Sequence, residues 1–599
     1  MKMNVTERVA ALRRVMAEKG IDAYMIPSAD FHQSEYVGEY FKARRYISGF
    51  TGSAGTVVIT QDDGGLWTDG RYFIQAEAQL KGSPIRLFKM NEEGYPTVEE
   101  YLADVVPEGG TVGFDGRVIP VVEGKALEEA FAQKQIKMHD TEDLIDLIWE
   151  DRPPMSEEKA FLLDVKYAGE SFEEKLERIR KIMQENGADV HVIATLDEVA
   201  WLFNIRGNDV VYTPVILGYA AVTLDDVYLF MDERKLNDEI VKSFGSARVE
   251  IRPYNDVYDY VKSLSEDQVI MIDPERMNYM LYKSIPAGVA KVETENPAVL
   301  MKAMKNDVEI ANTKNAYIKD GIACTKFMYW LKTNVGRMKI TEISAADELE
   351  RLRKEQDGFI DLSFETIAGY KEHAAMMHYA ATPESDYELK PEGMLLVDSG
   401  GHYYEGTTDI TRTYVLGELS EELKTQYTTV LRSMIDLSMA KFLYGCRGYN
   451  LDILARQPVW DLGLDFKCGT GHGVGYILSV HEGPTGFRWY IVPEKHETHP
   501  FEEGMIITDE PGIYIEGSHG IRTENQLIVR KAEKNENGQF MVFENITMSP
   551  IDLDGINPEL LTKRERDYLN AYHKQVYDVI GPHLTEEERE WLKEYTREV

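Results

Sequence analysis

The stretch LLVDSGGHYYEGTTDITRTY (395–414) decides how the second half of this chain folds. Asp398 ends an apolar run, a Gly-Gly pair follows as a turn, and Asp409 lies on the expected returning strand. In such a hairpin the two carboxylates can face each other, because alternate residues of a strand share a face. An aspartate beside a turn is more often structural, so this pair alone does not predict a site.

A second segment, GTGHGVGYILSVHEGP (469–484), places His472 among glycines, and His481 follows nine residues later. Glycines let a ligand approach the backbone closely. No GK[ST] follows them, which excludes a phosphate-binding loop. Eight of the 13 histidines lie between residues 373 and 519, so the histidine content also directs attention to this part of the chain.

Two further segments each carry a glutamate among apolar strand residues. GMIITDEPGIY (504–514) ends an apolar strand at Glu510, and GIRTENQLIV (520–529) carries Glu524 inside an expected strand. Burying a charged carboxylate is costly unless it is paired or bound to a metal. The two glutamates therefore favour a metal site shared with the aspartate pair and His472.

Charge balance indicates how many metal ions such a site holds. Four converging carboxylates carry about −4 charge and raise each other's pKa, and two divalent cations cancel this charge where one would not. The ligands are mostly oxygen, with one nitrogen and no sulfur, which favours Mn²⁺ and leaves Zn²⁺ and Co²⁺ as alternatives. Two close metals lower the pKa of a shared water from about 15.7 toward about 7. The sequence thus predicts a two-metal hydrolase with a metal-bridging hydroxide as nucleophile.

Composition bounds the class of protein. With 599 residues, 43% of them hydrophobic, the chain is expected to form three or four domains with real cores. The net charge of −37 disfavours nucleic-acid binding, because phosphate backbones would be repelled. No run approaches the roughly 18 apolar residues of a membrane span, and the start lacks the apolar region of a signal peptide. Three scattered cysteines form no CxxC. We expect a cytoplasmic protein without a membrane partner, disulfides or thiolate zinc.

The first half contains an internal repeat. LRRVMAEKGIDAYMIPSAD (12–30) matches IRKIMQENGADVHVIATLD (179–197) at several glycine, aspartate and apolar positions. Each copy is typical of a helix that stops at a glycine, Gly20 or Gly187, followed by a buried strand. We infer two related α/β domains in tandem, with chance similarity of two amphipathic helices as the alternative.

Prolines and helix signals place the expected boundaries. Two prolines in DRPPMSEEK (151–159) break any helix there, and the next boundary lies near Pro297. Capping-box patterns at Thr562 and Thr585 predict two helices in the tail, which we expect to serve packing or dimerisation. The predicted organisation is α/β (α+β), with domains 1–155, 156–299 and 300–599 and a helical extension at about 556–599.

In this order the four segments resemble the pita-bread metallopeptidases, which include methionine aminopeptidase, prolidase and aminopeptidase P. The match is closest to the three-domain aminopeptidase P type, usually cytosolic and dimeric. IPSADFHQSEY, SGFTGSAGT and WTDGRYF resemble that group's first domain, WLFNIRGND its second, and FENITMSPID with the tail its C-terminal extension. The resemblance implies two creatinase-like domains before a pita-bread catalytic domain. It also implies a homodimer that cleaves the first residue from peptides with N-terminal Xaa-Pro.

The same resemblance implies a ligand set. Asp398 would hold one metal, and His472 with Glu510 would hold the other. Asp409 and Glu524 would bridge both. Full activity in a His472→Ala variant would remove that histidine from the set.

Further residues are assigned roles by the resemblance alone. His378 and His481 match family histidines beside the substrate, and His481 also meets the developing charge. Arg522 matches an arginine next to the bridging glutamate, and Glu510 would carry a proton to the leaving proline nitrogen. The family often has a histidine four residues before the metal histidine, where this chain has Cys468. That departure implies a slower proton shuttle or altered substrate contact.

Several alternatives stay open at this point. Prolidase shares the five ligands but usually has one N-terminal domain, and it acts on dipeptides. Methionine aminopeptidase lacks both N-terminal domains, and creatinase lacks the ligand set. A non-catalytic peptide-binding protein on this fold would have lost the ligands, all of which are present. Arg71, in WTDGRYF, is either a core and turn residue or a substrate contact across domains.

Overall fold

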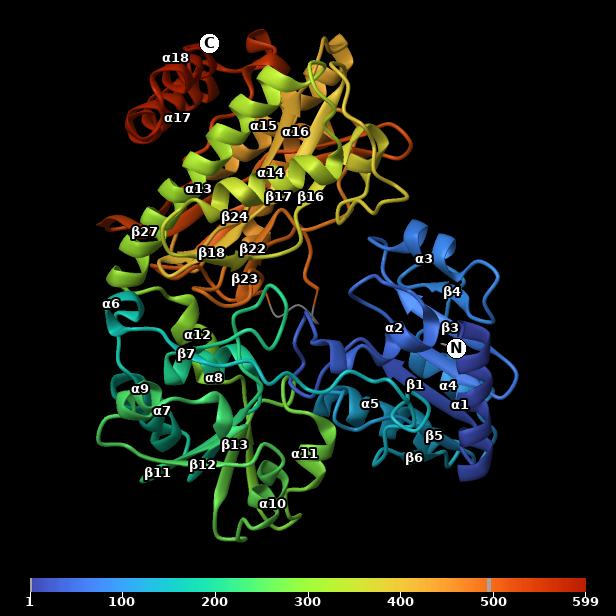
Figure 1. The fold of residues 1–599 in the computed structure, drawn as a ribbon. Coiled ribbons are helices and arrows are strands. Elements are labelled where there is room, and N and C mark those ends of the chain that lie inside the picture. Colours follow the sequence, from blue (N-terminus) through green and yellow to red (C-terminus); the bar gives the residue numbers. More distant parts are fainter. Residues whose placement is uncertain (1–2, 493–496) are drawn as a thin grey trace. The chain divides into compact units, whose positions relative to one another are not determined.

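The computed structural model describes residues 3–492 and 497–599, which form two units (Figure 1). Unit 1 comprises Met1–Leu162 and Glu170–Ala298, and unit 2 comprises Leu163–Gly169 and Val299–Val599. The short segment in unit 2 holds α6 (Val165–Ala168), so the chain enters unit 2, returns to unit 1 and crosses again. Among the helices of the described residues, none has the length and apolarity to cross a membrane.

Unit 1 contains two six-stranded sheets of the same topology. Their orders are β4-β3-β2-β1-β5-β6 and β12-β11-β10-β8-β13-β14. In each, a central strand pairs antiparallel with one neighbour (β1 with β2, β8 with β10) and parallel with the other (β1 with β5, β8 with β13). The strands are β1 (Ala23–Pro27), β2 (Thr56–Thr60), β3 (Gly64–Thr68), β4 (Arg86–Lys89), β5 (Thr111–Gly113), β6 (Lys137–His139), β8 (Val190–Ile193), β10 (Tyr219–Thr223), β11 (Asp226–Phe230), β12 (Arg248–Arg252), β13 (Val269–Ile272) and β14 (Ala290–Glu293).

The repeat in the sequence corresponds to a helix and the strand that follows it. α1 (Val5–Lys19) precedes β1, and α7 (Phe172–Glu185) precedes β8. Gly20 and Gly187 have φ of 67° and 64°, a conformation that glycine adopts without strain, so each lets the chain turn out of its helix. The prediction of two related α/β domains is confirmed.

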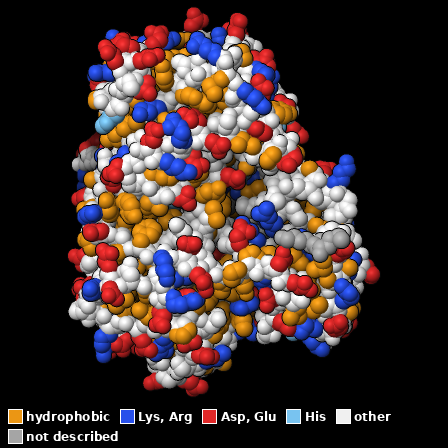
Figure 2. Space-filling view, in the orientation of Figure 1, with side chains coloured by type: hydrophobic (Ala, Val, Ile, Leu, Met, Phe, Trp, Pro, Cys, Tyr) orange, Lys and Arg blue, Asp and Glu red, His pale blue; other side chains and the backbone are white. Residues whose placement is uncertain are grey.

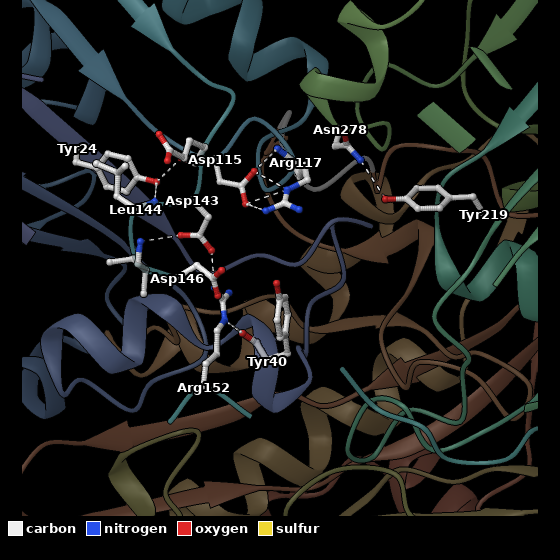
Figure 3. A network of polar contacts seen from close by, with 12 residues as sticks. Tyr24, Tyr40, Asp115, Arg117, Asp143, Leu144, Asp146, Arg152, Tyr219 and Asn278 are labelled. Atoms are coloured by element: carbon white, nitrogen blue, oxygen red, sulfur yellow. Dashed lines mark hydrogen bonds and ion pairs between the residues drawn. The ribbon is translucent and has the colours of Figure 1, made fainter. Parts of the chain in front are cut away.

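Buried polar groups join the two α/β domains within unit 1 (Figure 3). The side-chain amide of Asn278 donates to the carbonyl of Phe31 at 3.0 Å and to the hydroxyl of Tyr219 at 3.2 Å. Nearby, the guanidinium of Arg117 pairs with Asp115 at 2.9 Å. A satisfied buried network rigidifies the packing around it, which explains why both domains form one unit.

Unit 2 contains a six-stranded sheet, two three-stranded sheets and a two-stranded ribbon. The larger sheet has the order β21-β28-β27-β24-β22-β23, and a smaller one has the order β16-β17-β20. The strands are β15 (Phe359–Leu362), β16 (Ile367–Tyr370), β17 (Met394–Ser399), β18 (Gly401–Tyr403), β19 (Gly406–Thr407), β20 (Ile410–Val415), β21 (Lys441–Leu443), β22 (Gly471–Gly473), β23 (Glu482–Phe487), β24 (Ile506–Asp509), β25 (Gly512–Ile515), β26 (His519–Arg522), β27 (Asn525–Asn535) and β28 (Gly538–Asn545).

Helices cover the sheets of unit 2 and complete its core. They are α13 (Asp307–Asn334), α14 (Glu342–Lys354), α15 (Glu421–Ser438), α16 (Gly448–Asp461), α17 (Lys563–Ile580) and α18 (Glu586–Tyr595). The last two form the C-terminal tail, drawn in red, and α17 packs against α13 and α15 (Figure 1). Both predicted capping boxes are confirmed, at Thr562 with Glu565 and at Thr585 with Glu588.

The acidic charge of the chain is spread over its surface. On the face shown in Figure 2, acidic and basic side chains are interspersed over both units, with apolar side chains between them. A dispersed net charge of −37 is typical of solvated surfaces rather than of one binding patch. It agrees with a role for the acidity in solubility.

A buried histidine in the tail makes the stability of the protein pH-dependent. His573 is fully buried, its Nε2 accepts the amide proton of Ile551 at 3.1 Å, and burial lowers its pKa to about 3. Because the unfolded chain takes up this proton near pH 6.5, the stabilising contribution is complete above that pH and is lost as pH falls. Acidification from pH 7.5 to 5.5 is expected to cost about 1 kcal/mol at this residue.

Urea unfolding of the wild type and of His573→Gln at both pH values measures this contribution. The variant keeps an acceptor for Ile551 but cannot be protonated, so its stability should fall less on acidification. Equal losses in the two proteins would contradict the assignment.

Candidate metal centre

The aspartate pair lies at one end of the smaller sheet. β17 pairs antiparallel with β20, which places Asp398 opposite Thr411. Asp409 immediately precedes β20 rather than lying on it, and the β18–β19 ribbon is inserted between the two strands. The expected simple hairpin is therefore wrong in detail, although its two outer strands do pair. The insertion accommodates the eight residues from 400 to 407 without disturbing the register of Asp398.

The histidine and the first glutamate come from neighbouring strands of the larger sheet. His472 is the central residue of β22, and its amide donates to the Thr508 hydroxyl in β24 at 3.0 Å. Glu510 directly follows β24, and its amide donates to the carbonyl of Thr470 at 2.8 Å. These two bonds fix His472 and Glu510 side by side at one sheet end.

The second glutamate joins the two sheets. Glu524 lies in the short link between β26 and β27, so the expectation that it sits inside a strand is wrong. Its amide donates to the carbonyl of Thr411 at 3.1 Å, and its Oε2 accepts the Thr411 hydroxyl at 2.8 Å. A break in the strand frees Glu524 to turn toward the aspartates.

The five side chains predicted as ligands converge in the structure. Oxygen atoms of Asp398, Asp409 and Glu524 lie within 4.8 Å of one another. Nε2 of His472 lies 3.5 Å from Oδ2 of Asp409 and 3.6 Å from Oε1 of Glu510. Residues up to 126 positions apart thus lie close together, as the four sequence segments that carry them predicted.

Burial and mutual repulsion make this cluster costly without a cation. Burial, followed by the charges of neighbouring carboxylates, raises the pKa of Asp409 and that of Glu524 well above their usual values. Burial raises the pKa of Glu510 to about 7. Carboxylates that resist ionisation together are stabilised when divalent cations lie between them.

The donor set fits metal ions. Oδ1 of Asp398 and Oε1 of Glu524 are buried and accept no hydrogen bond within the described residues. Nδ1 of His472 lies 2.9 Å from the carbonyl of Gly473, to which it must donate, so Nε2 carries the lone pair toward the carboxylates. An imidazole oriented by such a bond is typical of a metal ligand.

Arg522 supplies the nearest fixed positive charge. Its Nη2 donates to Oδ2 of Asp398 at 2.5 Å, and its Nη1 donates to the hydroxyl of Tyr514 at 2.7 Å. Its Nε lies 3.9 Å from Oε2 of Glu510. Arg522 therefore orients two of the candidate ligands, Asp398 and Glu510.

The two histidines assigned to the substrate differ in their surroundings. The ring of His481 lies 4.3 Å from that of His472, at 87°, and its charge lowers the pKa of nearby Glu510. His378 is exposed in the turn after η3 (Lys371–Ala375), a segment that packs against β26. The structure brings His481 to the cluster and leaves His378 at the surface of unit 2.

Two other residues that the sequence analysis singled out, Arg71 and Cys468, lie outside the cluster of converging side chains. Arg71 belongs to unit 1, where its guanidinium makes two 2.8 Å bonds to Asp69, and its contact with a substrate stays a prediction. Cys468 is partly buried in the core behind Tyr514, and burial raises the pKa of its thiol to about 11. Whether Cys468 slows a proton shuttle or alters a substrate contact stays a prediction.

Sequence patterns missed several residues that support the cluster. Thr411 was inside the opening motif, two residues from Asp409, where an expected strand would have placed both side chains on one face. Arg412 and Tyr514 had no such signal. Glu482, next to His481, is buried and paired with Lys302 at 3.0 Å and with Lys305. This ion cluster fixes the strand that begins after His481.

Family descriptions match nearly the whole chain. The Creatinase/Prolidase N-terminal domain matches residues 8–148 and, in a second form, residues 151–309. Metallopeptidase family M24 matches residues 311–531, which include all five converging side chains. The C-terminal region of peptidase M24 matches residues 539–599.

The relatives that match this chain over its full length are named as aminopeptidases P or Xaa-Pro aminopeptidases. The chain is 38% identical to Aminopeptidase P1 of Arabidopsis thaliana over 650 residues, which cover 99% of both chains. It is also 38% identical to Xaa-Pro aminopeptidase 1 of Dictyostelium discoideum, with coverage of 99% of this chain and 96% of that one.

Solved structures give the same similarity in three dimensions. X-prolyl aminopeptidase from Caenorhabditis elegans, described as a cytosolic enzyme with a di-nuclear active site, matches with a TM-score of 0.94 at 33% identity over 100% of both chains. Xaa-Pro dipeptidase from Bacillus anthracis matches with a TM-score of 0.51 at 25% identity. That match covers 99% of its chain and 64% of this one.

Proposed function

This chain belongs to the Xaa-Pro aminopeptidase, or aminopeptidase P, family of M24 metallopeptidases, and we propose that the five converging side chains are its metal ligands. It is a metal-dependent aminopeptidase that releases the N-terminal residue from peptides with proline at the second position. The observation that supports the ligand set is the approach of Asp398, Asp409 and Glu524 oxygens to within 4.8 Å.

Two divalent metal ions fit the site, and we propose Mn²⁺ as the metal. His472 and Glu510 would hold one ion, Asp398 the other, and Asp409 with Glu524 would contact both. The preference for Mn²⁺ rests on a donor set of carboxylates and one imidazole without sulfur. Two such ions acidify a water to a pKa of about 7 and polarise the scissile carbonyl.

The protein's own residues would position the substrate and move the proton. Glu510, which lies 3.6 Å from His472 at the proposed metal site, would take the proton of the attacking water and deliver it to the leaving proline nitrogen. His481, beside His472, would donate to the oxygen on which negative charge develops. Arg522 would hold Asp398 in the ionised form through their 2.5 Å contact. His378 and Arg71 are proposed substrate contacts.

Proline in the second position explains the need for a dedicated pocket. Its nitrogen carries no hydrogen and its ring fixes φ near about −65°, so exopeptidases that hydrogen-bond this N–H lose a contact. Prolidase, the alternative activity, is disfavoured because the Xaa-Pro dipeptidase of Bacillus anthracis matches only 64% of this chain. A non-catalytic peptide-binding role is disfavoured by the intact ligand cluster.

Metal removal tests the function directly. Protein stripped with a chelator is expected to release no arginine from Arg-Pro-Pro, and added Mn²⁺ should restore release, because the site supplies neither an acidified water nor an electrophile without cations. Gly-Pro serves as the comparison substrate, since a dipeptidase would prefer it. Release from the stripped, folded protein, or from Gly-Pro alone, would contradict the proposal.

The oligomeric state and location are also proposals. We propose a cytoplasmic homodimer, because the Caenorhabditis elegans structure is described as cytosolic and the resembled group is usually dimeric.

Unit 2 exposes an aromatic face made of Trp460, Trp489 and Tyr490, which are 37%, 50% and 49% exposed. Ring centroids of Trp460 and Trp489 lie 5.9 Å apart, and those of Trp489 and Tyr490 lie 4.7 Å apart. Contiguous exposed aromatic rings are typical of interfaces, here with a second copy.

A charged substitution on the aromatic face tests the dimer. Trp489→Glu should convert the dimer to a monomer in sedimentation analysis, because desolvating the new carboxylate opposes association. Tyr95→Glu, on an exposed aromatic of unit 1, is the matched control and should leave the mass unchanged. A variant at Trp489 with the mass of the wild type would place the interface elsewhere.

A further inference from the structure

Helix α17 of the C-terminal tail carries two tyrosines that face the core of unit 2. Tyr568 and Tyr572 are four residues apart and therefore share one helix face. Tyr572 is 4% exposed, and the helix packs on α13 and α15. Packing explains the rings, but it does not explain where the two hydroxyls lie.

Arg412 connects the hydroxyl of Tyr572 with the metal centre. The guanidinium is 2% exposed, and its Nη2 donates to the Tyr572 hydroxyl and to the carbonyl of Ser549, both at 2.9 Å. Its Nη1 donates to the carbonyl of Glu524 at 2.5 Å and to that of Thr411 at 2.8 Å. Because the guanidinium fork is planar and rigid, a shift of the acceptors on one side displaces those on the other.

Glu524 is consequently fixed on three sides. Thr411 accepts its amide proton and donates to its Oε2, while Arg412 donates to its carbonyl. Its Oε1 is buried without a hydrogen-bond partner among the described residues. These contacts thus set the direction of the carboxylate that would contact both cations.

A second set of contacts leads from Tyr568 toward the other glutamate. The Tyr568 hydroxyl contacts the hydroxyl of Ser438, which donates to Oδ2 of Asp509 at 2.9 Å. Asp509 is fully buried and immediately precedes Glu510. One face of α17 therefore reaches the carbonyl of Glu524 through Arg412, and through Ser438 the side chain of Asp509, the residue before Glu510.

We propose that Tyr568 and Tyr572 are positioning residues through which helix α17 of the tail orients Glu510 and Glu524 for metal binding. The proposal rests on the ligand assignment made above. Arg412 carries a charge that it cannot lose, and burying such a charge is costly unless hydrogen bonds compensate it. Tyr572 of α17 supplies part of that compensation, beside the carbonyls of Ser549 and Pro550 and the side chain of Asn525, so the docked tail helps to hold the guanidinium against Glu524.

Phenylalanine variants of the full-length protein separate positioning from packing. Tyr572→Phe and Tyr568→Phe remove one hydroxyl each and keep the ring. Tyr577→Phe is the matched control on the same helix, where the ring lies against Arg589. Val576→Ala, at a fully buried position of the same core, is the control for a purely structural loss.

Three quantities are measured for each protein: the dissociation constants for Mn²⁺ alone, the melting temperature without metal, and kcat and KM on Arg-Pro-Pro. Tyr572→Phe is expected to raise a metal dissociation constant about tenfold and to lower kcat, with KM little changed. Tyr568→Phe should act in the same direction as an independent variant. Val576→Ala should lower the melting temperature and leave the dissociation constants unchanged, and Tyr577→Phe should change neither.

The outcomes separate a failure of the proposed positioning role from a failure of the proposed ligand assignment. Wild-type protein that binds two ions, with both site-facing variants binding them equally well, would overturn the positioning role and leave the ligand set intact. Wild-type protein that binds no metal would overturn the ligand assignment and this inference with it. Weaker metal binding in Val576→Ala as well would show that general loosening, and not the hydroxyls, controls the site.

Discussion

Replacement of His472 by alanine is expected to lower kcat/KM for Arg-Pro-Pro by about 10³-fold or more. The imidazole is the only nitrogen donor of the proposed ligand set, and its Nε2 faces Asp409 and Glu510 at 3.5 and 3.6 Å. Removing it weakens one metal position and leaves the carboxylates to repel each other. A metal-activated water with a polarised carbonyl supplies several kcal/mol of transition-state stabilisation, and each 1.36 kcal/mol is about a factor of ten.

The measurement combines initial rates with metal content and circular dichroism of the folded protein. His583→Ala, at an exposed histidine of the tail, is the control and should retain wild-type rates and two metal ions. An active His472→Ala protein, or one that is inactive but still loaded with both ions, would show that His472 is not a ligand.

Replacement of His481 by asparagine is expected to lower kcat by about 10²- to 10³-fold while the metal content stays at two ions. The loss corresponds to removing one donor aimed at a developing negative charge. The His481 ring lies 4.3 Å from that of His472, close enough to reach a substrate oxygen at the site without being one of the five converging side chains. The combination of full metal loading and low kcat separates this role from that of His472.

Rates at saturating Arg-Pro-Pro and metal analysis on the same sample test the second prediction. Because Glu482 and its lysine partners hold the following strand, the substitution should leave the melting temperature of the metal-free protein close to that of the wild type. Loss of metal from the variant would make His481 a structural support of the ligands. An unchanged kcat would remove it from the reaction.

The convergence of the five proposed ligands could be predicted from sequence because each stands in a short motif with a local reason for its place. Asp398 and Glu510 lie at the ends of apolar strands, and His472 lies among glycines, so burial of polar groups there signals a ligand. The repeat around Gly20 and Gly187 was equally readable, since a helix stop followed by an apolar run is a local pattern.

Other features of the site could not be predicted from the sequence, because they depend on contacts between residues far apart in the chain. Arg412 looked like one more strand residue beside Asp409, and its partner Tyr572 is 160 positions away. Lys302 and Glu482 are 180 positions apart, and no local pattern pairs them. The strand expected around Glu524 failed for a related reason, because the break there is imposed by its bonds to Thr411 in another sheet rather than by a turn residue.

The early excursion of the chain into unit 2 constrains how the protein is made. α6 packs in a small core with Tyr476 and Ile477, and the Tyr476 hydroxyl donates to the carbonyl of Tyr167, 309 positions earlier. During synthesis this helix leaves the ribosome long before residues 476 and 477 are made. It therefore stays without these partners while residues 170–298 complete unit 1. A fragment that begins at residue 299 would lack α6 and expose the apolar side chains it covers. Unit 2, despite its contiguous catalytic sequence, is therefore not a separable module.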